Sequence, residues 1–596
     1  MTEEEKAKVT RRKYLTYGGG AIVAVGVAAA GYYATLPAPT PTPTPTPVPT
    51  PTAATLPAHG IGVRVVDGVG KFYDRRTGER FVPRGNNYVR LASQQAPSGE
   101  MIFYHSTFNP GLYDPLQVDQ ALRKMRSDGY SVVRVFLNEC CLVGSVGDPT
   151  GGISSSYVAN IVDFLRRAKA NEIYVLIVGG DIPKAGGYRG YMEPYLSVFQ
   201  HWNPHVLSPG GVEAHRRFWH DFVKELINQE APLDAIFAYD IRNEVWFSAD
   251  FPPLSWTSGL VTTGNGKTYD MSKPDEKQKM MDENLVYWID QVRAAILELD
   301  PTALVTVSFF VPQKPHPFRP GDPRVIRTGP AIWESSADFI DLHAWPWDPP
   351  ALLEHVENFE MAGFARKPII MGEIGGFKGD PFWSAPRAAQ ALHDWQVESC
   401  RFGFDGWLLW TWDTFEQREF WHGLEEDGVI NEALSPKNRP DPCAPGPFNG
   451  QNIAFLKPSK ASHFLTTNPP SMALDGKPNT WWSAGDLPPQ WIEVDLQTPS
   501  VIKKIRLLVS QSPPGETVHR VLGKGSAGEA YKVLREFRGF TNDNDVLEHA
   551  PPTPWNGIRF IRIETVTSPS WVSWREIEVL RGLEEISAQP LPSLNP

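Results

Sequence analysis

Short apolar runs alternate with amphipathic stretches eight times between about residue 61 and residue 440 of this 596-residue chain. The apolar runs predict buried strands, and the stretches between them predict helices. Eight such alternations are typical of a (β/α)8 TIM barrel, in which helices cover a ring of parallel strands. The expected strands are residues 81–87, 131–137, 173–178, 235–241, 304–310, 339–343, 368–373 and 406–412, and the expected helices include 118–127, 157–170, 214–228 and 283–298.

Two of the expected strands lead directly into a carboxylate. Glu244 follows the fourth strand, and Glu373 ends the seventh. A parallel barrel brings the carboxyl ends of its strands together at one mouth, so these side chains are expected to meet there. Two facing carboxylates suit retaining glycoside hydrolysis, in which one is a protonated acid and the other an ionised nucleophile. The alternative is that each Glu only caps a strand in solvent.

The length and composition of the chain restrict its domains and ligands. A chain of 596 residues is too long for one core, so two or three domains are expected. A formal charge of −11 argues against nucleic acid or an anionic membrane as the ligand. The 20 Trp residues suggest indoles that stack on sugar rings, although Trp also fills protein cores.

The four cysteines do not form a disulfide framework. Cys140 and Cys141 are adjacent and cannot easily bridge to each other without strain. Cys400 and Cys443 could pair outside the cell, although the sequence itself does not show it. No Cys and His spacing indicates a zinc site.

Residues 1–37 are expected to form an export signal or a membrane anchor. Basic residues precede an uncharged run that is just long enough to span a bilayer, which predicts a cytoplasmic N-terminus. The segment around Arg11 and Arg12 resembles a twin-arginine export signal, and its cleavage stays open. Residues 38–57 alternate Pro with Thr and predict an extended linker, either a glycosylated stalk or a disordered spacer. The protein is therefore expected at the cell surface, anchored by its N-terminus, or secreted.

An ordered set of motifs at barrel spacing gives the region 58–440 a family resemblance. It resembles the retaining glycoside hydrolases whose catalytic carboxylates lie on strands four and seven, most of all family 5, which includes cellulases and mannanases. The motifs are Arg84-Gly85-Asn86-Asn87, Arg134 in the second strand, Asn243-Glu244, His343, Gly372-Glu373 and the run from Gly406 to Trp412.

The resemblance implies catalytic roles that agree with elementary chemistry, and it implies no cofactor for catalysis. Glu244 would be the general acid/base, with a pKa raised enough to donate a proton near neutral pH. Glu373 would be the nucleophile, and the positive charge of Arg134 would keep it ionised. The alternative for Arg134 is an ion pair in the barrel core.

The resemblance also implies a set of substrate-binding residues. Asn243 would bond the sugar 2-hydroxyl, His343 would join the network around the nucleophile unless it is only a core histidine, and Trp410 or Trp412 would form the floor under the scissile sugar. Asn87 and Trp345 complete the set, with Trp345 standing where the family usually has Tyr. Gly179-Gly180-Asp181 replaces the usual polar or His signal after strand three. These departures put the substrate in doubt more than the chemistry.

The remaining chain predicts a second domain after a linker at 441–450. The runs 491–496, 502–509 and 558–565 alternate apolar and polar residues, which is typical of an antiparallel sandwich. Residues 451–582 resemble the discoidin (coagulation factor V/VIII type C) fold, a β-sandwich of the jelly-roll kind, and a tail follows at 583–596. Such a domain in a prokaryotic hydrolase implies a second carbohydrate ligand, and the alternative is a domain that only packs on the barrel. Asp475, Thr480 and Glu576 match the positions of a structural Ca²⁺ in members of this fold.

The sequence as a whole predicts an extracellular β-glycosidase of the endo-β-1,4-mannanase or endo-β-1,4-glucanase type. The segment from Arg84 to Tyr88 slightly favours mannan, and long insertions at 183–210 and 248–272 are expected to wall the cleft. Two alternatives stay open: an exo-acting β-glycosidase on oligosaccharides or glycoconjugates, and a non-catalytic surface protein that binds carbohydrate.

Overall fold

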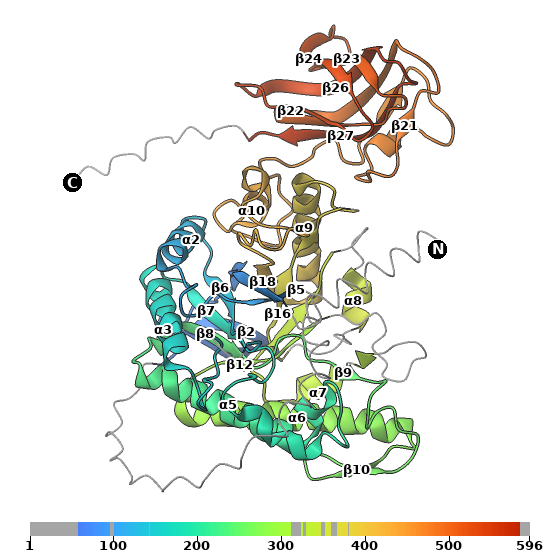
Figure 1. Ribbon diagram of the computed structural model, residues 1–596. Coiled ribbons are helices and arrows are strands. Elements are labelled where there is room, and N and C mark those ends of the chain that lie inside the picture. The colour runs from blue at the N-terminus through green and yellow to red at the C-terminus, as the bar shows by residue number, and fades with distance from the viewer. Residues whose placement is uncertain are drawn as a thin grey trace, which may run out of the picture. The chain divides into compact units, whose positions relative to one another are not determined.

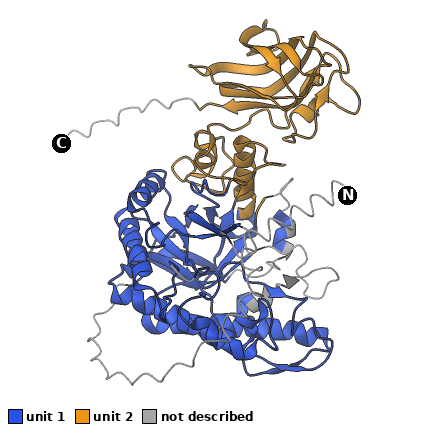
Figure 2. Cartoon of the chain, in the orientation of Figure 1, with its two compact units in different colours: residues 1–344, 352–374, 400–417 blue, residues 345–351, 375–399, 418–596 orange. Residues whose placement is uncertain are grey.

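The computed structural model of the chain describes residues 58–95, 101–141, 144–310, 324–325, 329–346, 352–358, 366–379 and 381–583. The predicted export segment, the Pro/Thr linker and residues 584–596 of the tail lie outside these ranges. Within them, no helix combines the length and the apolar character needed to cross a bilayer. Contacts divide the chain into two compact units (Figure 2): residues 1–344, 352–374 and 400–417 form one, and residues 345–351, 375–399 and 418–596 form the other.

The first unit is built on a closed parallel barrel. Its sheet has the order β12-β8-β7-β6-β3-β18-β16-β15-β13. Only Val307 separates β12 from β13, so these two segments are halves of one strand. One half pairs with β8 and the other with β15, which closes the ring. The predicted eight-stranded barrel is confirmed. The strands are β3 (Arg84–Asn87), β6 (Val132–Phe136), β7 (Tyr174–Val178), β8 (Ile236–Asp240), β12 (Val305–Thr306), β13 (Ser308–Phe310), β15 (Ile340–His343), β16 (Ile369–Ile374) and β18 (Phe404–Leu409).

Amphipathic helices surround the barrel strands (Figure 1). Asp114 and Ser154 begin two of the helices by accepting hydrogen bonds from backbone N–H groups of the first turn. The helices turn their apolar stripe inward, as Val118, Leu122 and Met125 of the first helix do. The helices of this unit are α2 (Pro115–Ser127), α3 (Ser155–Ala170), α4 (Asn203–Leu207), α5 (Pro209–Asn228), α6 (Pro274–Leu299), α7 (Gly329–Glu334) and α8 (Leu352–Asn358).

Several insertions follow the carboxyl ends of the barrel strands. A hairpin of β4 (Leu91–Gln95) and β5 (Met101–His105) follows the first strand. The insertion before β8 contains two short 3-10 turns and α4, and the one after β8 contains β9 (Phe247–Ser248), β10 (Leu260–Thr262) and β11 (Thr268–Asp270). Because they leave from strand ends, these insertions lie on the side of the barrel where the site is expected.

The C-terminal part of the second unit is an antiparallel sandwich. The 20-residue strand β22 (Gln490–Val509) joins its two halves: residues 490–495 pair with β26, and residues 502–509 pair with β27. Shifts in register between Asp495 and Ile502 mark the bend. The other strands are β20 (Ser459–Ala461), β21 (Trp482–Ser483), β23 (Gly515–Lys524), β24 (Lys532–Thr541), β25 (Val546–His549), β26 (Trp555–Thr567) and β27 (Ser573–Arg581).

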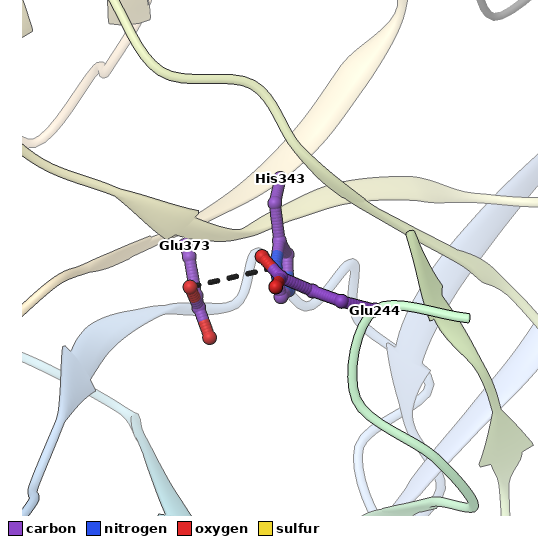
Figure 3. Close-up of side chains that lie close together, drawn as sticks. All are labelled: Glu244, His343 and Glu373. Carbon is purple, nitrogen blue, oxygen red and sulfur yellow. Dashed lines mark hydrogen bonds and ion pairs between the residues drawn. The ribbon is translucent and has the colours of Figure 1, made fainter. Parts of the chain in front are cut away.

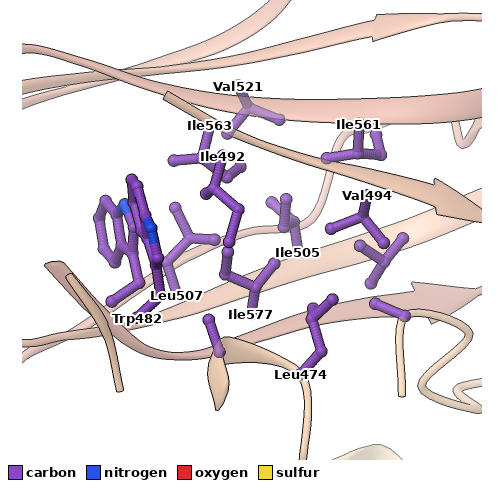
Figure 4. Close-up of a cluster of buried hydrophobic side chains, with 14 of the residues drawn as sticks. Leu474, Trp482, Ile492, Val494, Ile505, Leu507, Val521, Ile561, Ile563 and Ile577 are labelled. Atoms are coloured by element: carbon purple, nitrogen blue, oxygen red, sulfur yellow. The ribbon is translucent and has the colours of Figure 1, made fainter. Parts of the chain in front are cut away.

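The sandwich core follows the predicted alternation of apolar and polar residues. Ile492 and Val494 of β22 lie in the core together with Ile561 and Ile563 of β26, and Trp482 closes one end of the cluster (Figure 4). All five side chains are fully buried. The second unit also contains β17 (Gly376–Phe377), α9 (Ala385–Ser399), β19 (Phe420–Trp421) and α10 (Val429–Leu434).

Candidate active site

Glu244 and Glu373 face each other at the carboxyl ends of strands four and seven (Figure 3). Glu373 lies inside β16 and its side chain is 6% exposed, whereas the side chain of Glu244 is 20% exposed. Glu244 stands on the turn after β8 with a left-handed backbone, φ 50°. One oxygen of each carboxylate and one ring nitrogen of His343 all lie within 4.8 Å of one another.

His343, the last residue of β15, bridges the two carboxylates. Its Nδ1 lies 2.9 Å from Oε1 of Glu244 and 3.4 Å from Oε2 of Glu373. Its Nε2 lies 3.3 Å from Nη2 of Arg134. A guanidinium has only donors, so Nε2 must accept and the proton must sit on Nδ1. Burial lowers the pKa of His343 to about 3, so the ring is neutral and gives its one N–H to the carboxylates.

Arg134 of β6 is fully buried and connects the strands around the site. Its Nη1 donates to Oε1 of Glu373 at 2.6 Å and to Oδ1 of Asn87 at 3.0 Å. Its Nη2 donates to Oδ1 of Asn243 at 2.7 Å and to Oδ2 of Asp240 at 3.0 Å. The guanidinium therefore holds the nucleophile candidate and the residue before the acid candidate at the same time.

Two buried aspartates that the sequence analysis did not single out complete this network. Asp240 ends β8, and Oδ2 of Asp341 in β15 lies 3.8 Å from Nε of Arg134. Burial raises the pKa of Asp240 to about 6 and that of Asp341 well above its usual range. Arg134 lowers the pKa of both aspartates, but burial outweighs it, so they take up protons more readily than exposed ones. The signal that points to them is an acidic residue in an otherwise apolar strand.

The pKa of Glu373 is raised, although the predicted effect of Arg134 lowers it. Burial raises it, while His343 and Arg134 lower it, and the net shift is upward. The predicted influence of Arg134 on the carboxylate therefore has the right sign, but desolvation outweighs it. Burial lowers the pKa of Arg134, but the negative charges of Glu373 and the two aspartates outweigh burial and raise it overall.

The other predicted substrate-binding residues have different surroundings. Asn87 is fully buried, and its Nδ2 donates to the carbonyls of Gly372 and Leu409. Trp410 is 7% exposed, donates from Nε1 to Gln417 and stands edge-on to Phe136. Their contacts with substrate, like that of Asn243, remain predictions.

Trp345 belongs to the second compact unit, whereas the residues just described belong to the first. Its indole packs at 5.3 Å from the ring of Phe377 and at 5.4 Å from that of Phe420. The predicted role of Trp345 at the nucleophile stays a prediction.

The three predicted calcium ligands lie around one turn of the sandwich. Oγ1 of Thr480 lies 2.9 Å from both oxygens of Asp475 and 3.0 Å from the carbonyl oxygen of Lys477. Oε2 of Glu576 accepts from the N–H of Gly476, and its buried Oε1 has no hydrogen-bond partner among the described residues. An oxygen-only donor set with an unsatisfied buried carboxylate oxygen fits Ca²⁺.

The sandwich also carries a cleft of about 610 Å³. Trp481 and Trp571 line it and are 36% and 56% exposed. Arg575 lies over the ring of Trp481 and pairs with Asp543 at 2.7 Å. The cleft thus combines exposed indoles with a charged, hydrogen-bonding pair.

Fold and site together define a TIM-barrel chain with a paired-carboxylate site, followed by an antiparallel sandwich. Residues 458–577 match the F5/8 type C domain, which confirms the predicted discoidin-like domain. No curated protein matches the chain.

Solved structures are similar to each part. The exo-β-1,4-mannosidase Op5Man5 from Opitutaceae bacterium strain TAV5 is 17% identical over 64% of each chain, with a TM-score of 0.42. The endo-1,4-β-mannanase from Rhizomucor miehei is 17% identical over 63% of this chain and 98% of its own, with a TM-score of 0.43. The family 32 carbohydrate-binding module of C. perfringens NanJ, in complex with galactose, is 19% identical over 22% of this chain and 97% of its own, with a TM-score of 0.20.

Proposed function

We propose that the chain is an extracellular retaining β-glycosidase that hydrolyses β-linked polysaccharide by double displacement. The observation that carries the proposal is the pair Glu244 and Glu373, whose facing oxygens lie within 4.8 Å. Retaining enzymes hold their carboxyl groups about 5–5.5 Å apart, whereas inverting enzymes leave about 6.5–9.5 Å for a water molecule. A closest approach of the two carboxylates within 4.8 Å is compatible with retention, and the product anomer distinguishes the two mechanisms.

In the proposed first step, Glu373 attacks the anomeric carbon while Glu244 gives its proton to the leaving oxygen. Water then releases the sugar, and Glu244 takes up the proton of that water. Arg134 favours the ionised form of Glu373 through its bond to Oε1. The Nδ1–H of His343 lies near both carboxylates, so it can stabilise whichever one carries the charge. Asn243, which Arg134 holds in place, would bond the sugar 2-hydroxyl.

The proposed substrate is β-1,4-linked mannan or glucan. The segment from Arg84 to Tyr88 favours mannan, as the sequence resemblance implies. The insertions that follow β7 and β8 would supply walls beside the strand ends and so set chain length and endo or exo action.

The test is reducing-sugar release by the full-length chain on mannan, glucomannan, cellulose, mixed-linkage glucan and xylan. Activity on one polymer that Glu373→Ala abolishes would support the proposal, and the product anomer, read by NMR, tests retention. An inverted product would refute double displacement. A folded protein that leaves every polymer intact would favour the alternatives of a short-oligosaccharide substrate or a non-catalytic binding protein.

For the sandwich we propose carbohydrate binding at the cleft, because its two exposed indoles offer flat apolar faces beside a polar Arg575–Asp543 pair. Such a domain would raise the effective substrate concentration at the barrel. Trp571→Ala should weaken pull-down on the polymer that the barrel cleaves, while hydrolysis of soluble oligosaccharide stays unchanged. Equal pull-down by the variant and the parent would refute this assignment.

We also propose that Asp475, Thr480 and Glu576 hold a structural Ca²⁺, together with backbone carbonyl oxygens of the same turn. The ion would neutralise two carboxylates that now lie close to each other, since the charge of Asp475 contributes to the raised pKa of Glu576, after burial and Glu578. Its role would be to fix the turn and not to take part in catalysis.

A further inference from the structure

The segment that leaves strand β6 carries two adjacent free thiols outside the catalytic network. Cys141 is 8% exposed, Cys140 is half-buried, and their sulfur atoms lie 3.3 Å apart. The other two cysteines, Cys400 and Cys443, are disulfide-bonded. Disulfides form under oxidising conditions, and under the same conditions Cys140 and Cys141 could also be oxidised.

Cys140 is placed to react as a nucleophile. The S–H of Cys141 donates to the sulfur of Cys140 and lowers the pKa of Cys140 to about 7, against the effect of burial. The charges of Lys184 and Arg189 act in the same direction as this bond. A large fraction of Cys140 is therefore thiolate at neutral pH, and a thiol with a pKa near the ambient pH attacks disulfides fastest. The same bond raises the pKa of Cys141, which keeps the second thiol protonated until the first has reacted.

The backbone before the two cysteines is held firmly. Oε1 of Glu139 accepts from the N–H of Gly180 at 2.6 Å, and its carbonyl accepts from the N–H of Lys184 at 3.1 Å. The N–H of Cys140 donates to Oδ1 of Asn138 at 3.0 Å. To bring the two sulfur atoms to bonding distance, the two side chains and the peptide between them therefore have to move.

Gln94 of β4 touches both sulfurs from the neighbouring hairpin. Its Nε2 lies 3.9 Å from the sulfur of Cys140, and its Oε1 lies 3.7 Å from the sulfur of Cys141. The pair is thus part of a contact between the segment after strand two and the β4–β5 hairpin after strand one. Oxidation of the two thiols would therefore alter the contacts that Gln94 of this hairpin makes with them.

We propose that Cys140 and Cys141 form a reversible vicinal disulfide by exchange with a low-molecular-weight disulfide. The Cys140 thiolate attacks one sulfur of the small disulfide, forms a mixed disulfide and releases one small thiolate. Cys141 then gives its proton to solvent and attacks the sulfur of Cys140, which releases the second small thiolate. The protein loses two electrons and two protons in total, and the small disulfide becomes two thiols.

The bond should be more easily reduced than an ordinary disulfide. Adjacent Cα atoms lie about 3.8 Å apart across a trans peptide, below the separation of about 4.4–6.8 Å that bridged cysteines normally have. The strain makes the bridge more reducible, which is typical of labile disulfides. This lability separates the pair from Cys400 and Cys443.

The test equilibrates the full-length chain with mixtures of reduced and oxidised glutathione, followed by acid quenching, alkylation and peptide mass spectrometry. We expect the peptide with Cys140 and Cys141 to convert from a doubly alkylated form to an unalkylated form lighter by two hydrogen atoms than the free dithiol. The conversion should reverse as reduced glutathione rises, over a range in which Cys400 and Cys443 stay unalkylated. A wild-type peptide that stays fully alkylatable, or that carries only bound glutathione, at every ratio would overturn the proposal.

Two matched variants separate the steps. Cys141→Ser keeps the nucleophile without the second thiol, so Cys140 should accumulate as a stable mixed disulfide with glutathione. Cys140→Ser should react at least about 10-fold more slowly, because Cys141 is buried and burial by itself raises the pKa of its thiol. Equal rates for the two variants would refute the assigned order of attack. The readout does not depend on glycosidase activity, so the proposal stands or falls separately from the proposed function.

Discussion

Replacing Arg134 by Met is the sharpest test of the network around Glu373. The Nη1–Oε1 bond of 2.6 Å is the closest positive contact of this carboxylate among the described residues, and it opposes the effect of burial. An opposite charge at this range moves the pKa of a carboxyl by about 1 to 3. Without it, the already raised pKa of Glu373 should rise further. The proposed mechanism needs Glu373 in its ionised form, so the acid limb of kcat/KM should move to higher pH by about 1 to 3.

At a fixed pH on that limb, kcat/KM should fall about 10- to 1000-fold, because each pH unit corresponds to a factor of ten. The assay is the pH profile of kcat/KM on the polymer that the wild-type chain cleaves. Arg134→Lys is the matched control: it keeps one charge near Glu373 but cannot also hold Asn243 and Asp240, so kcat should fall with little movement of the limb. Removing one partner of a buried ion pair costs about 3–5 kcal/mol, so urea unfolding must accompany the kinetics. An unmoved acid limb in folded Arg134→Met would refute the reasoning.

Three further predictions concern other parts of the chain. In Gly372→Ala the new Cβ would lie 2.2 Å from Oδ2 of Asp341, so urea unfolding should show a loss of about 1–3 kcal/mol, whereas Gly190→Ala, with open space around it, should be neutral. Burial raises the pKa of Glu578 from 4.5 to about 7, so the free energy of unfolding should fall as the pH rises from 4.5 to 7. In Glu578→Gln this fall should be smaller by roughly 3 kcal/mol. The same dependence of the unfolding free energy on pH in the variant and the parent would contradict the prediction. Ca²⁺ should raise the Tm of the parent and not that of Asp475→Ala, and a Tm insensitive to chelation would exclude the proposed ion.

The barrel strands could be predicted because parallel strands buried on both faces appear as continuous apolar runs. The observed strands β6, β7 and β8 begin and end within about one residue of the expected ones. The interruption of strand five at Val307 could not be predicted, because the residues on both sides of Val307 are apolar or small. The sandwich could be predicted as well, because parts of β22 and β26 alternate apolar with polar residues, as Ile492-Glu493-Val494 and Ile561-Arg562-Ile563 do.

The partners of Arg134 could be predicted only in part. The pairing with Glu373 followed from the resemblance, but Asp240 and Asp341 were missed because a strand residue reveals its neighbours across the barrel only after the ring is closed. The net upward shift in the pKa of Glu373 could not be predicted for a related reason. The sequence and the resemblance could indicate a charged residue near Glu373. The effect of desolvation, which outweighs that charge, depends on how completely the folded strands cover the carboxyl group.

The backbone around Glu244 and Glu373 suits the different tasks proposed for them. Glu373 is fixed within a strand and almost fully covered, which suits an atom that must stay in line with the anomeric carbon. Glu244 stands in a left-handed conformation that costs a residue other than Gly about 1–3 kcal/mol unless its surroundings enforce it. They do: the N–H of Glu244 donates to Oγ of Ser308 at 3.2 Å, and the N–H of Asn243 donates to the carbonyl of Gly179 at 2.7 Å. The ends of strands three and five thus hold the turn that aims Glu244 at Glu373, and strain of this kind, sustained by neighbouring strands, is characteristic of a functional position.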